Sequence, residues 1–429
     1  MIVTLLFVVF FVLLLLEVPI SVALVLASVA GIAAAPDVTQ HLVPRRMFAA
    51  SNAFPLLAIP FFVMAGGIMG RGGMSKRLIA LASSLVGNIR GGFAITSVLA
   101  CMLFAAISGS TAATTAAIGA IMIPAIVESG FSRPSATSLQ ATAGSIGIII
   151  PPSIPMVLMG WIGGMSIGRL FLAGVVPGML LGLGLAAVCY FTAVAQRHAT
   201  SGHAFSPFEF LVRLKQAALP LLAVVLVIGG IMFGWVTATE AGVVAVFYAL
   251  FVSMAVYREL AWHQLGPILV DTAKITGIVV LCIAAASPFA WMLTVDQVPL
   301  RVSEGLLTAT QNAIVIKLVM IAILLVIGTF LDLTPAMLIF VPIFLPIARQ
   351  IGMNDVHFGA VVVCALGIGQ CTPPVGIALF VACSVAGTRM DQLFRPLFPY
   401  LAAMIAALLI TAFWEEAVLA LPNWFIPEQ

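Results

Sequence analysis

Apolar segments of helix length, separated by short polar stretches, run through the whole chain. The first, from Ile2 to Ala35, is nearly uncharged and is longer than a helix needs to cross a bilayer core of ~30 Å. Glu17 and Pro19 interrupt it, so the pattern allows one long kinked helix or two helices joined by a tight turn. Further helices are expected over residues 54–70, 78–88, 92–107, 116–127, 135–150, 154–164, 168–195, 217–235, 238–257, 275–293, 314–327, 337–347, 358–366, 377–385 and 397–421.

The longest polar stretch, residues 196–215, is expected to link two halves of the chain, residues 1–195 and 216–429. Its basic side chains (Arg197, Arg213 and Lys215) outnumber its single acid, Glu209. An excess of Lys and Arg is typical of cytoplasmic loops, so the linker is expected on the cytoplasmic side. Residues 36–46 are polar enough to form a shorter loop.

The two halves repeat one pattern at a constant offset of 222 residues. Pro124 precedes Pro346 by this distance, Gly147 precedes Gly369, and the pair at 151–152 precedes the pair at 373–374. Because prolines are sparse in the chain, such matches indicate an internal repeat.

Each repeat contains two polar interruptions of its apolar segments. The turn segments, residues 107–115 and 328–335, are rich in small or polar residues; the Pro-Pro segments, residues 145–153 and 367–375, each contain two consecutive prolines. The apolar helix after the first turn segment reads as short, which favours a re-entrant hairpin with its tip at residues 108–111. Paired interruptions in corresponding halves of a membrane protein indicate a transport site.

Helix ends at such a tip offer chemistry for ions. Free carbonyls at the end of one helix suit a small cation, and free N–H groups at the start of the next suit a carboxylate. The first turn segment adds hydroxyl oxygens and a glycine that lets the backbone approach: Ser108, Gly109, Ser110, Thr111, Thr114 and Thr115. The alternative is that these small residues only allow close helix packing.

Asp332 is the most informative single residue, because a carboxylate at bilayer depth is costly unless it is paired, hydrated or protonated. Cation binding would offset that cost, and a structural hydrogen bond is the alternative. Gln370, Cys371 and Thr372 lie in the second Pro-Pro segment and are candidates for contact with a solute. Lys274 and Arg301, which flank apolar segments, are expected to extend toward the membrane surface.

Glu240 is expected in the first turn of a helix that Thr237 or Thr239 caps.

Composition defines the class of protein. The chain is 63% hydrophobic and 8% charged, with a mean hydropathy of +1.23, whereas soluble domains carry about 25% charged residues. It is therefore expected to be a polytopic membrane protein. The net charge of +3 is scattered, so nucleic acid is not indicated as a partner, and neither the six cysteines nor the five histidines show metal-ligand spacing.

No catalytic constellation and no phosphate-cradling glycine loop is present in the sequence, so the chain is expected to be neither an enzyme nor an ATPase, and to need no cofactor beyond a coupling ion.

Taken together, these motifs resemble the large membrane subunit of tripartite ATP-independent periplasmic (TRAP) transporters, the DctM-like family. The resemblance covers nearly the whole chain and rests on residues 54–67, 108–110, 147–153, 237–241, 328–332 and 372–374. The family often has Thr-Pro-Thr-Glu where this chain has Ala238, a difference expected to soften the turn without changing the chemistry.

The resemblance implies an all-α, elevator-type fold of the ion-transporter superfamily, with two inverted repeats that each contain scaffold helices, a re-entrant helical hairpin and a broken helix. It implies hairpin tips at residues 108–111 and 330–335, and sodium bound where each tip meets its broken helix. The residues this assigns to sodium are Ser108, Gly109, Ser110, Gly147, Pro151, Asp332, Thr334, Gly369, Thr372 and Pro373. Those assigned to the solute are Thr111, Ser153, Gln370 and Cys371.

The resemblance also implies two protein partners: a small four-helix membrane subunit, expected from another chain, and a periplasmic solute-binding protein. The resulting hypothesis is sodium-coupled import of a small organic anion bearing a carboxylate, across a bacterial inner membrane. The alternative is a stand-alone sodium- or proton-coupled symporter of the same superfamily, which needs no binding protein.

Overall fold

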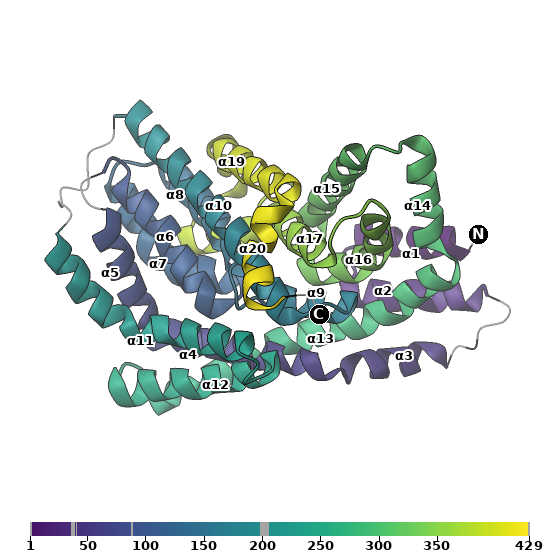
Figure 1. Ribbon diagram of the computed structural model, residues 1–429, viewed down its shortest axis with the longest axis horizontal. Helices are drawn as coiled ribbons and strands as arrows, with labels where there is room; N and C mark the ends of the chain where they lie inside the picture. Colours follow the sequence, from purple (N-terminus) through teal and green to yellow (C-terminus); the bar gives the residue numbers. More distant parts are fainter. Residues whose placement is uncertain (1, 36–38, 40, 87–88, 198–205, 428–429) are drawn as a thin grey trace.

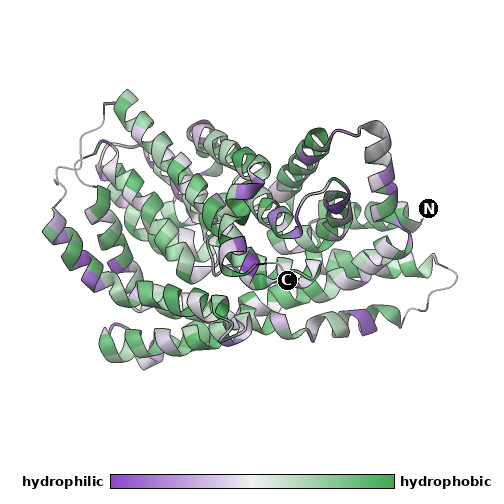
Figure 2. Cartoon of the chain, viewed as in Figure 1, coloured by the Kyte–Doolittle hydropathy of each residue, from purple (hydrophilic) through white to green (hydrophobic). Residues whose placement is uncertain are grey.

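The computed structural model describes residues 2–35, 39, 41–86, 89–197 and 206–427, and these residues fold into helices without a strand. Nine helices in this part of the chain are long and apolar enough to cross a membrane. Hydrophobic residues dominate most of these helices (Figure 2). The prediction of an all-α polytopic membrane protein is confirmed.

The first half contains α1 (Ile2–Leu15), α2 (Ile20–Ala33), α3 (Leu42–Ser51), η1 (Phe54–Leu57), α4 (Ala58–Arg71), α5 (Met74–Val86), α6 (Gly92–Ser108), α7 (Thr111–Glu128), α8 (Arg133–Ser145), η2 (Ile146–Ile148), α9 (Ile154–Gly163) and α10 (Ile167–Ala195). The second half contains α11 (Pro207–Met232), α12 (Ala238–Leu250), η3 (Phe251–Val256), η4 (Trp262–Gln264), α13 (Leu265–Val295), α14 (Val298–Ala309), α15 (Ala313–Phe330), α16 (Leu333–Gln350), α17 (Asp355–Gly369), α18 (Ile377–Ala386), η5 (Met390–Leu393), α19 (Phe394–Phe413) and α20 (Glu415–Phe425).

The repeat seen in the sequence is also a repeat of helices. Helices α7 and α16 both have 18 residues and begin at Thr111 and Leu333, which are 222 residues apart. Helices α8 and α17 begin at Arg133 and Asp355, again 222 residues apart. Both Pro-Pro pairs contain a cis peptide bond. The same order of helical hairpin and interrupted helix therefore occurs in each half.

The N-terminal segment forms two helices, one of the two arrangements that its sequence allowed. Glu17, between α1 and α2, adopts a left-handed conformation with φ of 60°, and Pro19 is the N-cap of α2. Proline cannot continue the preceding helix, and its fixed φ suits the start of the next one.

Several predicted boundaries were wrong. Helix α3 begins inside the loop expected at residues 36–46. Helix α11 begins inside the linker expected at residues 196–215, because the Ser206 side chain caps it and Pro207 supplies its first helical residue. Residues 198–205 of that linker and 87–88 of another predicted helix lie outside the described residues. Helix α13 begins ten residues before the segment expected at 275–293, and α14 was not expected at all.

The hairpin helices are longer than expected, whereas α8 is shorter. Helix α7 begins at Thr111, so residues 111–115 of the first turn segment are helical. Helix α8 ends at Ser145, five residues before the expected end. The chain then passes through the short η2 turn before it reaches Pro151.

The helix expected at residues 397–421 is divided into α19 and α20 at Trp414, which has φ of −108° and ψ of 62°. Two donors from the second half bond to carbonyls near the end of α19. His357 Nε2 lies 2.8 Å from the Thr411 carbonyl oxygen, and Lys317 Nζ donates to the Ala412 carbonyl at 3.4 Å. Side-chain donors of this kind satisfy the carbonyls that a helix end leaves without intrahelical partners.

The two hairpins interlock with both broken helices. The first hairpin is α6 and α7, and the second is α15 and α16. Helix α7 packs on α8 and on α18, while α16 packs on α17 and on α9. Each hairpin therefore contacts the broken helix of its own half and the second piece of the other broken helix.

A second group of helices borders this interlocked body. Helix α13 packs against α2, α3, α4 and α16, and α4 packs against α12. In Figure 1, α11, α4, α12, α13 and α3 follow one edge of the view, and the hairpins and broken helices lie on one side of them. The cavity described below lies where α4 and α13 meet the first hairpin.

Candidate functional site

The first hairpin turns within two residues. Helix α6 ends at Ser108, Gly109 is left-handed with φ of 59°, and Ser110 caps α7 by accepting a hydrogen bond from the Ala113 N–H at 3.4 Å. A Cβ at Gly109 would lie 2.8 Å from the Pro152 carbonyl oxygen. The backbone angle and the close approach both require glycine, and they seat the tip directly on the first Pro-Pro segment.

Hydroxyl groups gather beneath this tip. The hydroxyls of Ser108 and Thr114 are 2.7 Å apart and both residues are buried. A Cβ at Gly147 would lie 2.6 Å from Thr114 Oγ1 and 2.8 Å from the Ser110 carbonyl oxygen. The helix break at Gly147 therefore lies against both a hydroxyl and a carbonyl of the first hairpin.

Thr115 has an unusual place beside this group. Its hydroxyl is buried and has no hydrogen-bond partner among the described residues. A Cβ at Gly144 would lie 1.9 Å from Thr115 Oγ1, so the hydroxyl sits directly on the backbone of α8. A buried hydroxyl without a partner costs about 1–3 kcal/mol, which an ion or water ligand would offset.

The second hairpin meets its own broken helix through glycines. A Cβ at Gly369 would lie 2.6 Å from Gly328 Cα, and a Cβ at Gly328 would lie 3.0 Å from Gly369 Cα. In addition, the Gly376 N–H donates to the Thr329 carbonyl at 3.3 Å. The second turn segment and the second Pro-Pro segment are thus in direct backbone contact.

Gln370 connects the two tips. Its Nε2 donates to Asp332 Oδ1 at 2.7 Å, and its Oε1 accepts from the Thr111 hydroxyl at 3.4 Å. Asp332 is the N-cap residue of α16 and is partly buried. The structural hydrogen bond weighed for Asp332 as an alternative is therefore present. Thr111 and Gln370, both assigned to the solute, are hydrogen-bonded to each other, and that assignment stays a prediction.

Two residues assigned to the solute are turned inward. Ser153 is fully buried, donates to the Ile148 carbonyl and accepts from the Met156 N–H at 3.3 Å, so it acts as the N-cap of α9. Cys371 is fully buried and its Sγ bonds to the Ala141 carbonyl at 3.4 Å. Neither side chain is free to reach a solute in this arrangement, so their assignment stays a prediction.

The remaining assigned residues lie in or beside the breaks. Thr372 donates to the Ile368 carbonyl at 3.0 Å, and Thr334 is buried in the first turn of α16. Pro151 and Pro373 are the first members of the two cis Pro-Pro pairs. Their assignment to sodium likewise stays a prediction.

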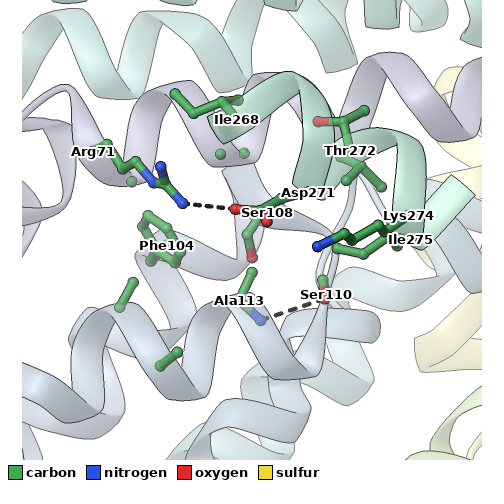
Figure 3. Close-up of a pocket in the computed structure, with 16 residues that line it drawn as sticks. Arg71, Phe104, Ser108, Ser110, Ala113, Ile268, Asp271, Thr272, Lys274 and Ile275 are labelled. Atoms are coloured by element: carbon green, nitrogen blue, oxygen red, sulfur yellow. Dashed lines mark hydrogen bonds and ion pairs between the residues drawn. The ribbon is translucent and has the colours of Figure 1, made fainter. Parts of the chain in front are cut away.

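A cavity of about 550 Å³ opens beside the first tip (Figure 3). Three charged side chains line it: Arg71 on α4, and Asp271 and Lys274 on α13. Arg71 and Asp271 form an ion pair of 2.7 Å. The other lining residues are Val63, Gly66, Gly67, Gly70, Phe104, Ser108, Ser110, Ala113, Ala116, Ala117, Ile268, Thr272 and Ile275.

These three charged residues were not predicted as site residues. Lys274 was expected to extend from a helix end to the membrane surface, but α13 begins at Leu265, so Lys274 lies inside the helix and on the cavity wall. The signal that could have found the site is the spacing Asp271-x-x-Lys274, because ionisable residues within a membrane helix are candidates for function.

Glu240 lies outside the site. Thr237 caps α12, and the two residues form a reciprocal capping box in which Glu240 accepts from the Thr237 N–H at 2.7 Å. The expected structural role of Glu240 is confirmed, with Thr237 as the cap.

Known proteins resemble this chain over nearly its whole length. Residues 7–417 match the family described as "Tripartite ATP-independent periplasmic transporter, DctM component". The C4-dicarboxylate TRAP transporter large permease protein DctM of Pseudomonas aeruginosa is 40% identical over 389 residues, which are 91% of each chain. The isethionate TRAP transporter permease protein DctMQ of Oleidesulfovibrio alaskensis is 40% identical over 95% of this chain, which spans 64% of that longer relative.

Solved structures share the fold. The Alcanivorax borkumensis YdaH transporter is similar with a TM-score of 0.58 and 12% identity, over 87% of this chain and 86% of that one. Neisseria gonorrhoeae MtrF is similar with a TM-score of 0.54 and 13% identity, over 87% of this chain and 83% of that one. At this identity the likeness concerns the fold alone.

Proposed function

Because the chain belongs to the DctM component family of tripartite ATP-independent periplasmic transporters, we propose that it imports a carboxylate-bearing organic solute together with sodium, as the large permease subunit of such a transporter. A multi-pass membrane permease of this family moves its solute without ATP. The coupling ion, the solute class and the partners are the parts that we propose.

The observation that carries the sodium proposal is the buried hydroxyl of Thr115, which has no partner in the described structure. It follows Thr114, whose hydroxyl lies within hydrogen-bond distance of Ser108 and next to the helix break at Gly147. Hydroxyl and carbonyl oxygens suit a hard cation, by the same logic that applies to calcium and magnesium. The end of α6 adds a partial negative charge.

The second half supports a matching ion site. Asp332 offers a carboxylate beside the backbone contact of Gly328 with Gly369, and the hydroxyls of Thr334 and Thr372 lie in the adjoining segments. We propose that sodium binds in both halves, at corresponding places of the repeat. The bond between Asp332 and Gln370 would then position the carboxylate for the ion.

The family also supports two partners, a small membrane subunit with four helices and a periplasmic solute-binding protein. We propose that the chain lies in a bacterial inner membrane with residues 196–215 on the cytoplasmic side. The solute would be a small organic anion, consistent with relatives that are named as transporters of C4-dicarboxylates, isethionate or 2,3-diketo-L-gulonate.

Uptake into proteoliposomes tests the proposal. The vesicles contain this chain and its small subunit, and the inward sodium gradient is varied with and without the solute-loaded periplasmic protein. We expect uptake to need both the gradient and the periplasmic protein. Sodium-driven uptake without the periplasmic protein would favour the stand-alone symporter, and uptake indifferent to sodium would overturn the ion sites.

A matched pair of variants tests the first ion site. Thr115→Val removes the unpartnered hydroxyl at nearly constant volume and should raise the sodium concentration needed for half-maximal uptake. Thr142→Val removes an equally buried hydroxyl, whose partners among the described residues are the carbonyls of Ser138 and Leu139 on its own helix. It should leave the sodium dependence unchanged, and equal effects of the two changes would contradict the site.

A further inference from the structure

The cavity beside the first tip carries one more positive than negative charge. Asp271 is paired with Arg71 at 2.7 Å, so these two charges compensate each other. Lys274 lies three residues after Asp271 on α13, and it forms no ion pair within 4 Å among the described residues. Its ammonium group therefore remains as the uncompensated charge of the cavity.

Figure 3 shows Lys274 and Ser110 on the same side of the cavity, with the amino end of Lys274 directed inward. Both residues line this cavity. Ser110 caps α7, an 18-residue helix whose first N–H groups have no acceptor within the helix. The helix start and Lys274 thus present positive charge to the same space.

The walls are mostly apolar. The side chains of Phe104 on α6 and of Ile268 and Ile275 on α13 line the cavity, with Val63 and alanines of α7. The lining hydroxyls are those of Ser108, Ser110 and Thr272, and the first two are already engaged, Ser108 with Thr114 and Ser110 with the Ala113 N–H. The rest of the wall offers a hydroxyl group of a bound molecule few partners, and a buried polar group without a partner is costly. A volume of about 550 Å³ is within the usual range for sites that bind small molecules.

From this charge and lining we propose that Lys274 is the counter-charge for a single carboxylate, and that the cavity selects monoanionic solutes with an apolar body over dianions and polyhydroxylated acids. This inference rests on the proposed function, because it names the class of solute that the permease carries. It assigns Lys274 as the residue that determines charge selectivity. The charge of Arg71 is already compensated by Asp271.

Direct binding to the purified full-length chain tests the inference without the choice made by a periplasmic protein. The probe is radiolabelled 4-methylpentanoate, a branched monocarboxylate, in sodium buffer. Unlabelled succinate, gluconate and 4-methylpentanamide serve as competitors that change, in turn, the charge, the hydroxyl content and the carboxylate. We expect saturable binding that only unlabelled 4-methylpentanoate displaces well.

Three variants test whether Lys274 supplies the positive charge that binds the carboxylate. Lys274→Met should weaken binding by about tenfold to a hundredfold, the range for losing a hydrogen bond to a charged group, whereas Lys274→Arg should retain most of it. Asp271→Asn leaves two cations in the cavity, so succinate should become a better competitor than with the unmodified chain. Because Lys274→Arg keeps the charge, its binding separates loss of charge from loss of folding.

Several outcomes would overturn the inference. The first is that 4-methylpentanoate does not bind saturably. The second is that succinate, gluconate or 4-methylpentanamide displaces the probe as well as unlabelled 4-methylpentanoate does. The third is that Lys274→Met binds the probe as tightly as the unmodified chain. Failure of the proposed function would look different, because it would appear as uptake of the natural solute that ignores the sodium gradient. The binding assay and the uptake assay therefore fail independently.

Discussion

Gln370 Nε2 and Asp332 Oδ1 are 2.7 Å apart, which joins the second Pro-Pro segment to the one carboxylate of the second turn segment. The same Gln370 side chain accepts from the hydroxyl of Thr111 at the other tip. A single amide thus contacts both halves of the internal repeat. The two tips cannot separate without breaking one of these bonds.

Gln370→Leu should lower both stability and uptake. Gln370 is buried, and leucine has similar bulk but neither donor nor acceptor, so Asp332 loses its donor and Thr111 loses its acceptor. Removing one partner of a buried polar pair costs about 1–3 kcal/mol. The thermal midpoint of the purified protein and the rate of sodium-driven uptake measure the effect. Gln392→Leu, at an exposed position, is the control, and an equal loss in both variants would contradict the assigned role.

Gly369→Ala should destabilise the protein, because its Cβ would lie 2.6 Å from the Cα of Gly328 and backbone must move to admit it. Overpacking of this kind costs about 1–3 kcal/mol. Gly305→Ala, in α14, meets nothing within 4 Å and should be neutral or stabilising by up to about 1 kcal/mol through helix propensity. Thermal unfolding in detergent compares the two. A neutral Gly369→Ala would show that the helices are not in contact there.

Thr237→Ala should lower the stability of the start of α12. The Thr237 hydroxyl accepts from the Glu240 N–H at 3.3 Å, and loss of an N-cap costs about 0.5–2 kcal/mol. Thr237→Ser keeps the oxygen and should remain close to the unmodified protein. Hydrogen exchange of the first-turn amides of α12 measures the difference. Equal protection of these amides from exchange in the two variants would contradict the capping role of Thr237.

His357→Leu should destabilise the junction of α19 and α20. His357 is fully buried, with its Nε2 at 2.8 Å from the Thr411 carbonyl and its Nδ1 at 3.1 Å from Glu415 Oε2. Leucine leaves that carbonyl without its side-chain donor, at a cost of about 1–3 kcal/mol. The thermal midpoint should fall, while His263→Leu, on the exposed η4 turn, should not change it. A midpoint unaffected by His357→Leu would argue against this cap.

The interruptions of the chain could be predicted from sequence because their causes are local. The turns at Gly109 and Asp332 lie in the turn segments marked by small and polar residues, and both broken helices are interrupted within their Pro-Pro segments, although α8 ends at Ser145, five residues earlier than expected. The division between α19 and α20 at Trp414 could not be predicted. The carbonyls of Thr411 and Ala412 at the end of α19 are bonded by His357 and Lys317, which are distant in sequence.

The direction of side chains was less predictable than their position. Ser153 and Cys371 lie in the expected breaks, but each bonds to a backbone carbonyl and is turned away from open space. The role of Lys274 depended on where α13 begins. Asp271 and Lys274 interrupt the apolar pattern in its first turns, so the pattern alone places the start of the helix after them. The residues of the cavity come from α4, α6, α7 and α13, and only the packing of these helices brings them together.

The contact between Gly328 and Gly369 separates what can vary in this protein from what cannot. Where backbone lies on backbone there is no side chain to exchange, and any addition moves a whole helix. The cavity walls contributed by α4 and α13, in contrast, present ordinary side chains that substitution can shorten, lengthen or recharge. On the proposed role of this cavity, a lineage built on this scaffold changes its cargo through single replacements along those walls while its interlocked helices are inherited intact.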